Sequence, residues 1–105
     1  MRLIFKSHSP KSHLIMKFGY TILYVENVPI SIDFYEAAFG FQRKFITPEN
    51  DYGELLSGET TLAFASTELG NSNLKQGFIK SSLDEKPFGI EVVFGTENIE
   101  EDLQD

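Results

Sequence analysis

Glu91 is the residue whose type and surroundings most suggest chemistry. It lies between Ile90 and Val92 in the apolar segment GIEVVFGT, residues 89–96. A carboxylate without a partner is costly to place in an apolar strand, so it should be functional, paired or open to a solvent-filled hollow. The alternative is a solvated Glu on the open face of an edge strand.

Histidine and cysteine chemistry is excluded from most of the chain. Both histidines, His8 and His13, lie within residues 1–17, and the sequence has no Cys. A nucleophilic triad, a histidine base, a thiol nucleophile and a zinc–thiolate site therefore have no members in residues 18–105. A metal site there would need oxygen ligands that converge from several strands.

The charge is unevenly distributed along the 105 residues, whose net charge is −7. Residues 1–17 hold four bases and no acid, so residues 18–105 hold all 16 acids and five of the nine bases. An acidic body with scattered bases is a poor partner for a phosphate backbone, so we expect no nucleic-acid binding. A small cationic ligand is favoured instead.

Residues 1–17 form a basic leader with two interpretations. We expect a disordered tail or an upstream extension, and the alternative is a targeting peptide, since the segment is basic and free of acids. Its apolar runs are too short for a secretory signal, and no run in the chain is long enough to span a membrane. The chain is therefore predicted to be a one-domain cytoplasmic protein with no membrane partner.

A strand and a helix are predicted to open the body. In the strand, residues 18–25, Tyr20, Ile22 and Tyr24 alternate onto one face. Asn27 is a suitable helix cap, Pro29 suits the first turn, and Gly40 supplies a left-handed stop after Phe39. The apolar face of this helix is expected to carry Ile30, Phe34 and Ala37 or Ala38, with Asp33 and Glu36 toward solvent.

Three strands follow as a meander. They are predicted over residues 41–47, 52–56 and 60–66. A Pro/Asn/Asp turn over residues 48–51 joins the first two, and Gly58 forms the corner of the second hairpin. The order is thus strand, helix and three strands, a βαβββ module over residues 18–66.

The remaining residues are predicted to begin a second module. Residues 67–88 are polar with little periodicity, which is typical of a linker or flexible loop. Residues 89–96 read as a strand and 97–105 as the capped start of a helix, repeating the opening of the first module. The fold class is therefore α+β, with a βαβββ module followed by the opening βα of an incomplete second module, residues 89–105.

The segment YTILYVENVPISIDFYEAAFGF, residues 20–41, resembles the opening signature of the glyoxalase/bleomycin resistance/dioxygenase (vicinal oxygen chelate) superfamily. In that family a strand leads through an acid-bearing corner into a helix with a characteristic aromatic and glycine ending. The residues that carry this ending here are Phe34, Tyr35, Phe39, Gly40 and Phe41. The order of elements agrees with the family over residues 18–105, with the second module cut short.

The resemblance also implies where a metal would bind. Enzymes of the family hold a divalent metal in a concave sheet, and the corresponding positions fall on Tyr20, near Phe64 and on Glu91, with a fourth beyond Asp105. Glu91 is the one position that matches a ligand type. The metal site is therefore expected to be dismantled, with no resident cofactor, and Glu91 is the remaining candidate ligand.

Aromatic residues are expected to take the place of the missing ligands. Tyr20, Tyr24 and Phe64, with Glu91, are predicted to line the concave face as a ligand-binding surface. The alternative for the three aromatic residues is ordinary packing in the core or between subunits. No catalytic residue is predicted.

The leading hypothesis is a glyoxalase-like domain that binds a small molecule, with a cationic aromatic ligand favoured, without a catalytic metal. A homodimer or higher association is expected, since the cut-short second module would leave an unpaired strand edge. The alternative is a metal-dependent lyase, similar to lactoylglutathione lyase, or a dioxygenase, completed by a partner chain or by a missing C-terminal part. A third hypothesis is a truncated fragment without function.

Overall fold

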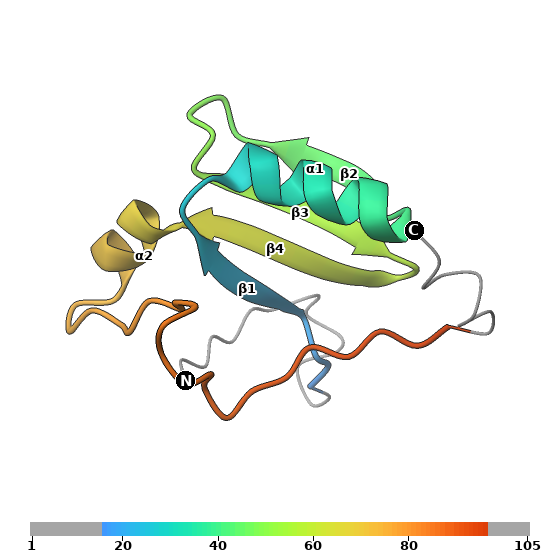
Figure 1. Ribbon diagram of the computed structural model, residues 1–105. Coiled ribbons are helices and arrows are strands. Elements are labelled where there is room, and N and C mark those ends of the chain that lie inside the picture. The colour runs from blue at the N-terminus through green and yellow to red at the C-terminus, as the bar shows by residue number, and fades with distance from the viewer. Residues whose placement is uncertain (1–15, 97–105) are drawn as a thin grey trace.

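A four-stranded sheet with one long helix on one face forms the body of the protein (Figure 1). The computed structural model describes residues 16–96. The elements in chain order are β1 (Tyr20–Val25), α1 (Val28–Phe39), β2 (Gln42–Ile46), β3 (Tyr52–Ser57), β4 (Thr60–Ser66) and α2 (Thr67–Asn73).

The strand order in the sheet is β1-β4-β3-β2. β1 pairs in parallel with β4, whereas the β2–β3 and β3–β4 pairs are antiparallel. The parallel pairing requires a crossover, and α1 with the β2–β3 meander provides it. This arrangement confirms the predicted α+β fold with a βαβββ module.

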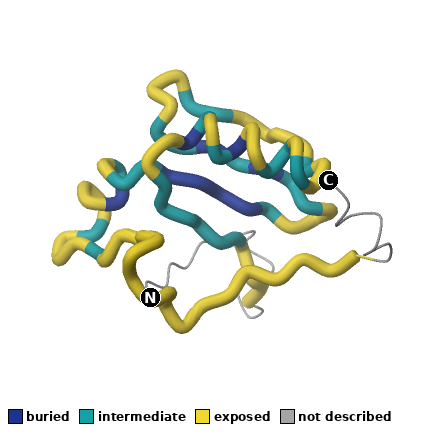
Figure 2. Tube along the Cα trace, viewed as in Figure 1, coloured by how far each residue is buried: buried dark blue, intermediate teal, exposed yellow. Residues whose placement is uncertain are grey.

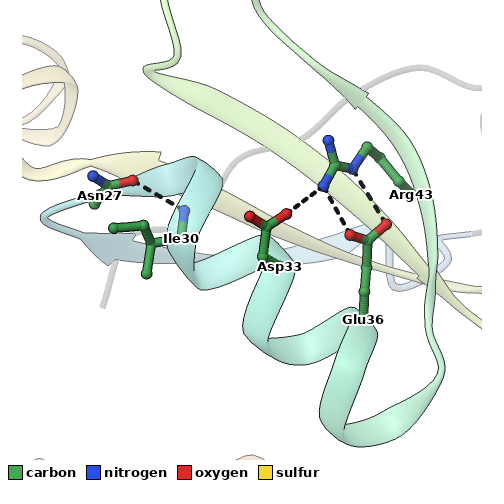
Figure 3. Close-up of polar contacts among 5 residues, drawn as sticks. All are labelled: Asn27, Ile30, Asp33, Glu36 and Arg43. Carbon is green, nitrogen blue, oxygen red and sulfur yellow. Dashed lines mark hydrogen bonds and ion pairs between the residues drawn. The ribbon is translucent and has the colours of Figure 1, made fainter.

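Helix α1 begins and ends at the predicted residues. The Asn27 side chain accepts a hydrogen bond of 3.0 Å from the backbone N–H of Ile30 (Figure 3). Pro29 lies in the first turn, where the absence of an N–H group costs nothing. Gly40 takes the left-handed conformation with φ of 71°, and its N–H donates to the carbonyl of Glu36.

The core lies between α1 and the sheet. Val28 and Ile32 of α1 are fully buried and pack against the buried side chains of Leu55, Leu62 and Phe64. Figure 2 shows burial concentrated in β4 and in the strand and helix beside it. Apolar area removed from water on this face is the main stabilising contribution to the fold.

The apolar face of α1 differs from the prediction. Ile30 and Phe34 are 65% and 60% exposed, whereas Val28 and Ile32 are buried. Both pairs are four residues apart, so helical periodicity alone does not distinguish them. The approach of the helix to the sheet decides which row is covered, and the prediction of the Ile30–Phe34 row as the inner face was wrong.

Gly53 allows α1 to approach the sheet closely. A Cβ atom at this position of β3 would overlap the side chain of Ile32 and lie 3.1 Å from the backbone oxygen of Phe45. Helix and sheet therefore meet at a point where no larger residue fits without a shift.

An ion-pair cluster fastens the outer side of α1 to β2. Arg43 of β2 contacts Asp33 at 2.6 Å and Glu36 at 2.8 Å, with a further bond from its Nε to Glu36 (Figure 3). The hydrogen bond to Glu36, with the charges of both acids, raises the pKa of Arg43. Asp33 and Glu36, which were expected to face solvent, thus lie on the outer side of α1 and also pair with Arg43 of β2.

The segment after β4 departs from the prediction of a flexible loop over residues 67–88. It opens with helix α2, whose first turn is capped by the Ser66 hydroxyl, which accepts from the N–H of Leu69 at 3.0 Å. Residues 74–96 then continue without further helix or strand. A local capping signal thus produces a helix in a segment that lacks hydrophobic periodicity.

The strand predicted over residues 89–96 is not formed. These residues are exposed and pair with none of β1 to β4. Their composition favours a strand, but a strand also requires a neighbour to accept and donate its backbone hydrogen bonds. The predictions for residues 1–15 and for a helix over residues 97–105 lie outside the described part of the chain.

Of the two helices described, α1 is the longer at 12 residues. Neither has the length and hydrophobicity that crossing a bilayer requires.

Candidate functional site

The face of the sheet opposite α1, here called the open face, carries the candidate site. Side chains alternate along a strand, so the residues between those of the core point away from α1. Eleven residues belong to the open face by this register: Tyr20, Ile22, Tyr24, Gln42, Phe45, Tyr52, Glu54, Leu56, Thr61, Ala63 and Ala65.

Two alanines form the centre of the open face. Ala63 and Ala65 of β4 are 0% and 1% exposed although the long helix α1 lies on the other side of the sheet. The pairing places Ala65 between Tyr24 and Tyr52, so larger side chains on the neighbouring strands stand around the small ones. The result is a low apolar floor with aromatic residues on both sides.

Glu54 brings a shielded carboxylate to this floor. Its side chain is 13% exposed. One carboxylate oxygen accepts a hydrogen bond of 2.6 Å from the Tyr52 hydroxyl, and the other lies 3.1 Å from the Lys44 ammonium nitrogen. The pairing of β2 with β3 shifts its register between Arg43 and Phe45, so Lys44 is the extra residue at this irregularity. Its side chain reaches Glu54 on the open face.

The Tyr52 phenol is held in its neutral form. Burial, the hydrogen bond to Glu54 and the negative charge of that carboxylate raise the pKa of Tyr52 well above its usual range, and a hydrogen bond with Tyr20 adds to this. Tyr52 therefore keeps its proton and acts as a hydrogen-bond donor. It links the Tyr20 side of the open face to Glu54.

Two of the four predicted site residues lie together on the open face. Tyr20 and Tyr24 of β1 are both half-buried there, separated by Ile22. Their shared face follows from the two-residue alternation that the sequence already showed.

Phe64 does not lie where it was expected. Its side chain is fully buried on the α1 side of β4, with its ring centroid 5.1 Å from that of Tyr35. Its neighbours Ala63 and Ala65 take the open-face positions instead. The expectation of a concave-face ring at this position was wrong, and the alternative of core packing is correct.

Glu91 is also placed differently from the prediction. It is exposed, in a segment that is not a strand, so the expected carboxylate within an apolar strand is not formed. The carboxylate that the structure brings to the open face is Glu54. Sequence reasoning missed Glu54, although its spacing from Tyr52 in the strand segment YGELL already placed both residues on one face.

The described residues lack the set of ligands that the divalent metal implied by the family resemblance needs. A protein site for such a metal provides three or more ligand groups. Within residues 16–96, no group of three His, Cys, Asp or Glu side chains is positioned to hold a metal ion. The open-face carboxylate is engaged by Tyr52 and Lys44, so the described residues do not fit a metal.

A partly open cavity of about 250 Å³ lies at the edge of the sheet where β1 and β4 begin. Residues 92–95 line one side of it, and Thr61 of the open face lines it together with Thr21 and Leu62 of the side that α1 covers. Its lining includes no titratable side chain and no residue of the site predicted from sequence.

The comparison with protein-family models agrees with the fold. The model of the Glyoxalase/Bleomycin resistance protein/Dioxygenase superfamily matches residues 17–102. Comparison with curated proteins gives no match.

Among solved structures, the chain is similar to the bleomycin-binding protein from bleomycin-producing Streptomyces verticillus, complexed with copper(II)-bleomycin. The identity is 23%, over 51% of this chain and 44% of that chain, with a TM-score of 0.39. The chain thus spans less than half the length of that structure. The family model, by contrast, covers most of this sequence. This chain belongs to the glyoxalase/bleomycin resistance protein/dioxygenase superfamily.

Proposed function

We propose that this domain binds a small cationic aromatic molecule on its open face, without a catalytic metal. The observation that carries the proposal is the Glu54 carboxylate, 13% exposed and held by Tyr52 beside a floor of two alanines. A shielded carboxylate next to aromatic rings suits a ligand that combines positive charge with a flat apolar body.

The aromatic residues supply the apolar contacts. Tyr20 and Tyr24 on β1 and Tyr52 on β3 stand on either side of Ala63 and Ala65. All three tyrosines are half-buried, so part of each remains accessible. Because Ala63 and Ala65 are covered by their neighbours, a flat ring would contact the accessible parts of the tyrosines, whose π-faces also attract cations.

The charge of the ligand is inferred from Glu54 and from its surroundings. The chain has a net charge of −7, which raises the local concentration of cations. In this structure Lys44 pairs with Glu54 at 3.1 Å, so a cationic ligand has to compete with the lysine for the carboxylate. Lys44 is 38% exposed and can move into solvent at little cost.

A matched pair of probes tests the role of charge. N-methylquinolinium is a permanent cation, and quinoline is a neutral ring of nearly the same shape at neutral pH. We expect the cation to bind more tightly, and Glu54→Gln to weaken its binding about tenfold, the equivalent of about 1.4 kcal/mol. Glu59→Gln is the control, since it removes the same charge from the exposed β3–β4 hairpin. Isothermal calorimetry measures each affinity.

The proposal fails if both probes bind equally and Glu54→Gln changes neither affinity. Lys44→Met provides a second check. Removing the competing ammonium should strengthen cation binding several-fold while leaving quinoline binding unchanged. A weaker affinity for the cation would mean that Lys44 assists the ligand and that Glu54 is not its anchor.

The absence of a catalytic metal is tested by titration with Ni(II), Zn(II) and Fe(II). We expect no tight binding to the isolated chain. Tight binding of one ion per chain that Glu91→Gln abolished would overturn this part of the proposal and favour the lyase or dioxygenase hypothesis. The expected homodimer and the cytoplasmic location stay predictions, and light scattering measures the first.

A further inference from the structure

Phe78 lies directly against one wall of the proposed ligand surface. Its ring centroid is 4.9 Å from that of Tyr24, with an angle of 32° between the ring planes. Phe78 comes from the segment that follows α2, which returns to the β1 side of the sheet (Figure 1). Its neighbours Gly77 and Ile79 are exposed, whereas Phe78 is half-buried. The ring is therefore a point at which this segment attaches to the sheet.

Gly70 of α2 completes this contact. It is buried, and a Cβ atom there would lie 2.7 Å from the Phe78 ring and 2.8 Å from the Tyr24 ring. Real Cβ atoms do not approach other atoms so closely, so the two rings meet across a backbone that has room for glycine alone. The stack thus consists of Tyr24, Phe78 and the Gly70 backbone.

The stretch around Phe78 is only lightly held as far as Phe94, whose ring contacts Phe39 and Phe41. Residues 75–77 and 79–93 are exposed, and after α2 they form neither helix nor strand. A turn in which the N–H of Gly77 donates to the carbonyl of Leu74 precedes the ring. Stretches with few buried contacts open at low free-energy cost, so the ring can leave Tyr24 without unfolding the sheet.

We propose that Phe78 is an intramolecular competitor that occupies the stacking surface of Tyr24 until a flat ligand displaces it. This inference rests on the proposed function of the open face and adds its regulation. A ligand ring that stacks on Tyr24 replaces one aromatic contact by another, so part of its binding free energy is spent on releasing Phe78. Removal of the Phe78 ring should therefore strengthen binding.

Phe78→Ala tests the competition with N-methylquinolinium as the probe. The size of a stacking contact implies that the affinity should rise about two- to tenfold. Ile79→Ala is the matched control, because Ile79 belongs to the same segment and is 73% exposed; its affinity should equal that of the unmodified protein. Phe78→Leu keeps an apolar side chain without the ring and serves as the second variant if Phe78→Ala lowers the melting temperature markedly.

Nuclear Overhauser effects between the rings of Tyr24 and Phe78 provide an independent readout. We expect them in the free protein and expect their loss when the probe saturates the site. Equal affinities of the unmodified protein and both Phe78 variants, with the ring contacts still present in the complex, would overturn the competition but leave the proposed function intact. A weaker affinity of the variants would also overturn it, since Phe78 would then be part of the ligand site. Binding by none of the proteins would overturn the proposed function and the competition together.

Discussion

The two faces of the sheet are built from the same four strands but carry different kinds of side chains. The face under α1 carries Leu55, Leu62 and Phe64, all buried and apolar. The open face carries Glu54 and tyrosines, joined by hydrogen bonds and an ion pair. The comparison shows how strand alternation lets one sheet hold an apolar core on one side and a surface of polar and aromatic side chains on the other. Substitutions on the two faces should therefore differ in their effects.

The largest effect is expected from Phe64→Ala on the helix-covered face. The ring is fully buried against Tyr35, so its removal leaves a cavity and should lower the free energy of unfolding by about 3–5 kcal/mol. Urea denaturation measures the loss, and Phe64→Leu should cost less because it fills most of the space. If Phe64→Ala lowered the free energy of unfolding only slightly, Phe64 would not be part of the core, and the contrast between the two faces would be wrong.

Gly53→Ala should have the next largest effect. The added methyl group would overlap Ile32 of α1 and force the helix away from the sheet, at a cost of about 1–3 kcal/mol. Gly19→Ala is the matched control, since no atom lies within 4 Å of a Cβ at that position. If both variants unfolded at the same urea concentration, α1 would not pack as closely as described.

Tyr52→Phe probes the open face, where the effect on stability should be smaller. Loss of the hydrogen bond to Glu54 should cost about 0.5–1.5 kcal/mol. Because the pKa of Tyr52 is raised in the folded protein, its stabilising contribution is complete below the ordinary tyrosine value of 10.0 and decreases as the pH rises above that value. The difference in stability between the unmodified protein and the variant should therefore shrink at high pH. A difference that stays constant through this range would contradict the raised pKa.

Arg43→Met should have the smallest effect of the four. The guanidinium joins Asp33 and Glu36 on the surface of α1, where water and salt screen the ion pairs. We expect a small decrease in melting temperature at low ionic strength, which becomes smaller in about 1 M salt as the Debye length falls to about 3 Å. A loss as large as that of Gly53→Ala would mean that this cluster, rather than the core, holds the helix in place.

The local elements of the fold could be predicted because their signals lie within a few residues. Asn27 accepts from the third residue after it, and Gly40 takes a left-handed conformation that other residues rarely adopt. The left-handed Gly58 likewise marks the β3–β4 corner. Helix α2 was missed because a cap without apolar periodicity is a weak signal, and residues 89–96 read as a strand on composition alone.

The candidate site could be predicted only in part. Alternation placed Tyr20 and Tyr24 on one face correctly, and the same rule would have paired Tyr52 with Glu54. It did not indicate which face α1 covers, so Phe64 was assigned to the wrong side. Glu91 drew attention because its neighbours Ile90 and Val92 are apolar, but both are exposed in a segment that pairs with none of β1 to β4.

The sequence by itself determined the order of the elements from β1 to β4, the caps of α1, the turns between the strands, the acidic charge and the membership of Tyr20 and Tyr24 in one face. Only the tertiary structure decided that α1 covers Phe64, that Lys44 meets Glu54 and that Phe78 stacks on Tyr24. The physical reason is distance along the chain. Caps and alternation depend on neighbouring residues, whereas a covered face or a stack joins residues far apart, and competition among many possible packings selects them.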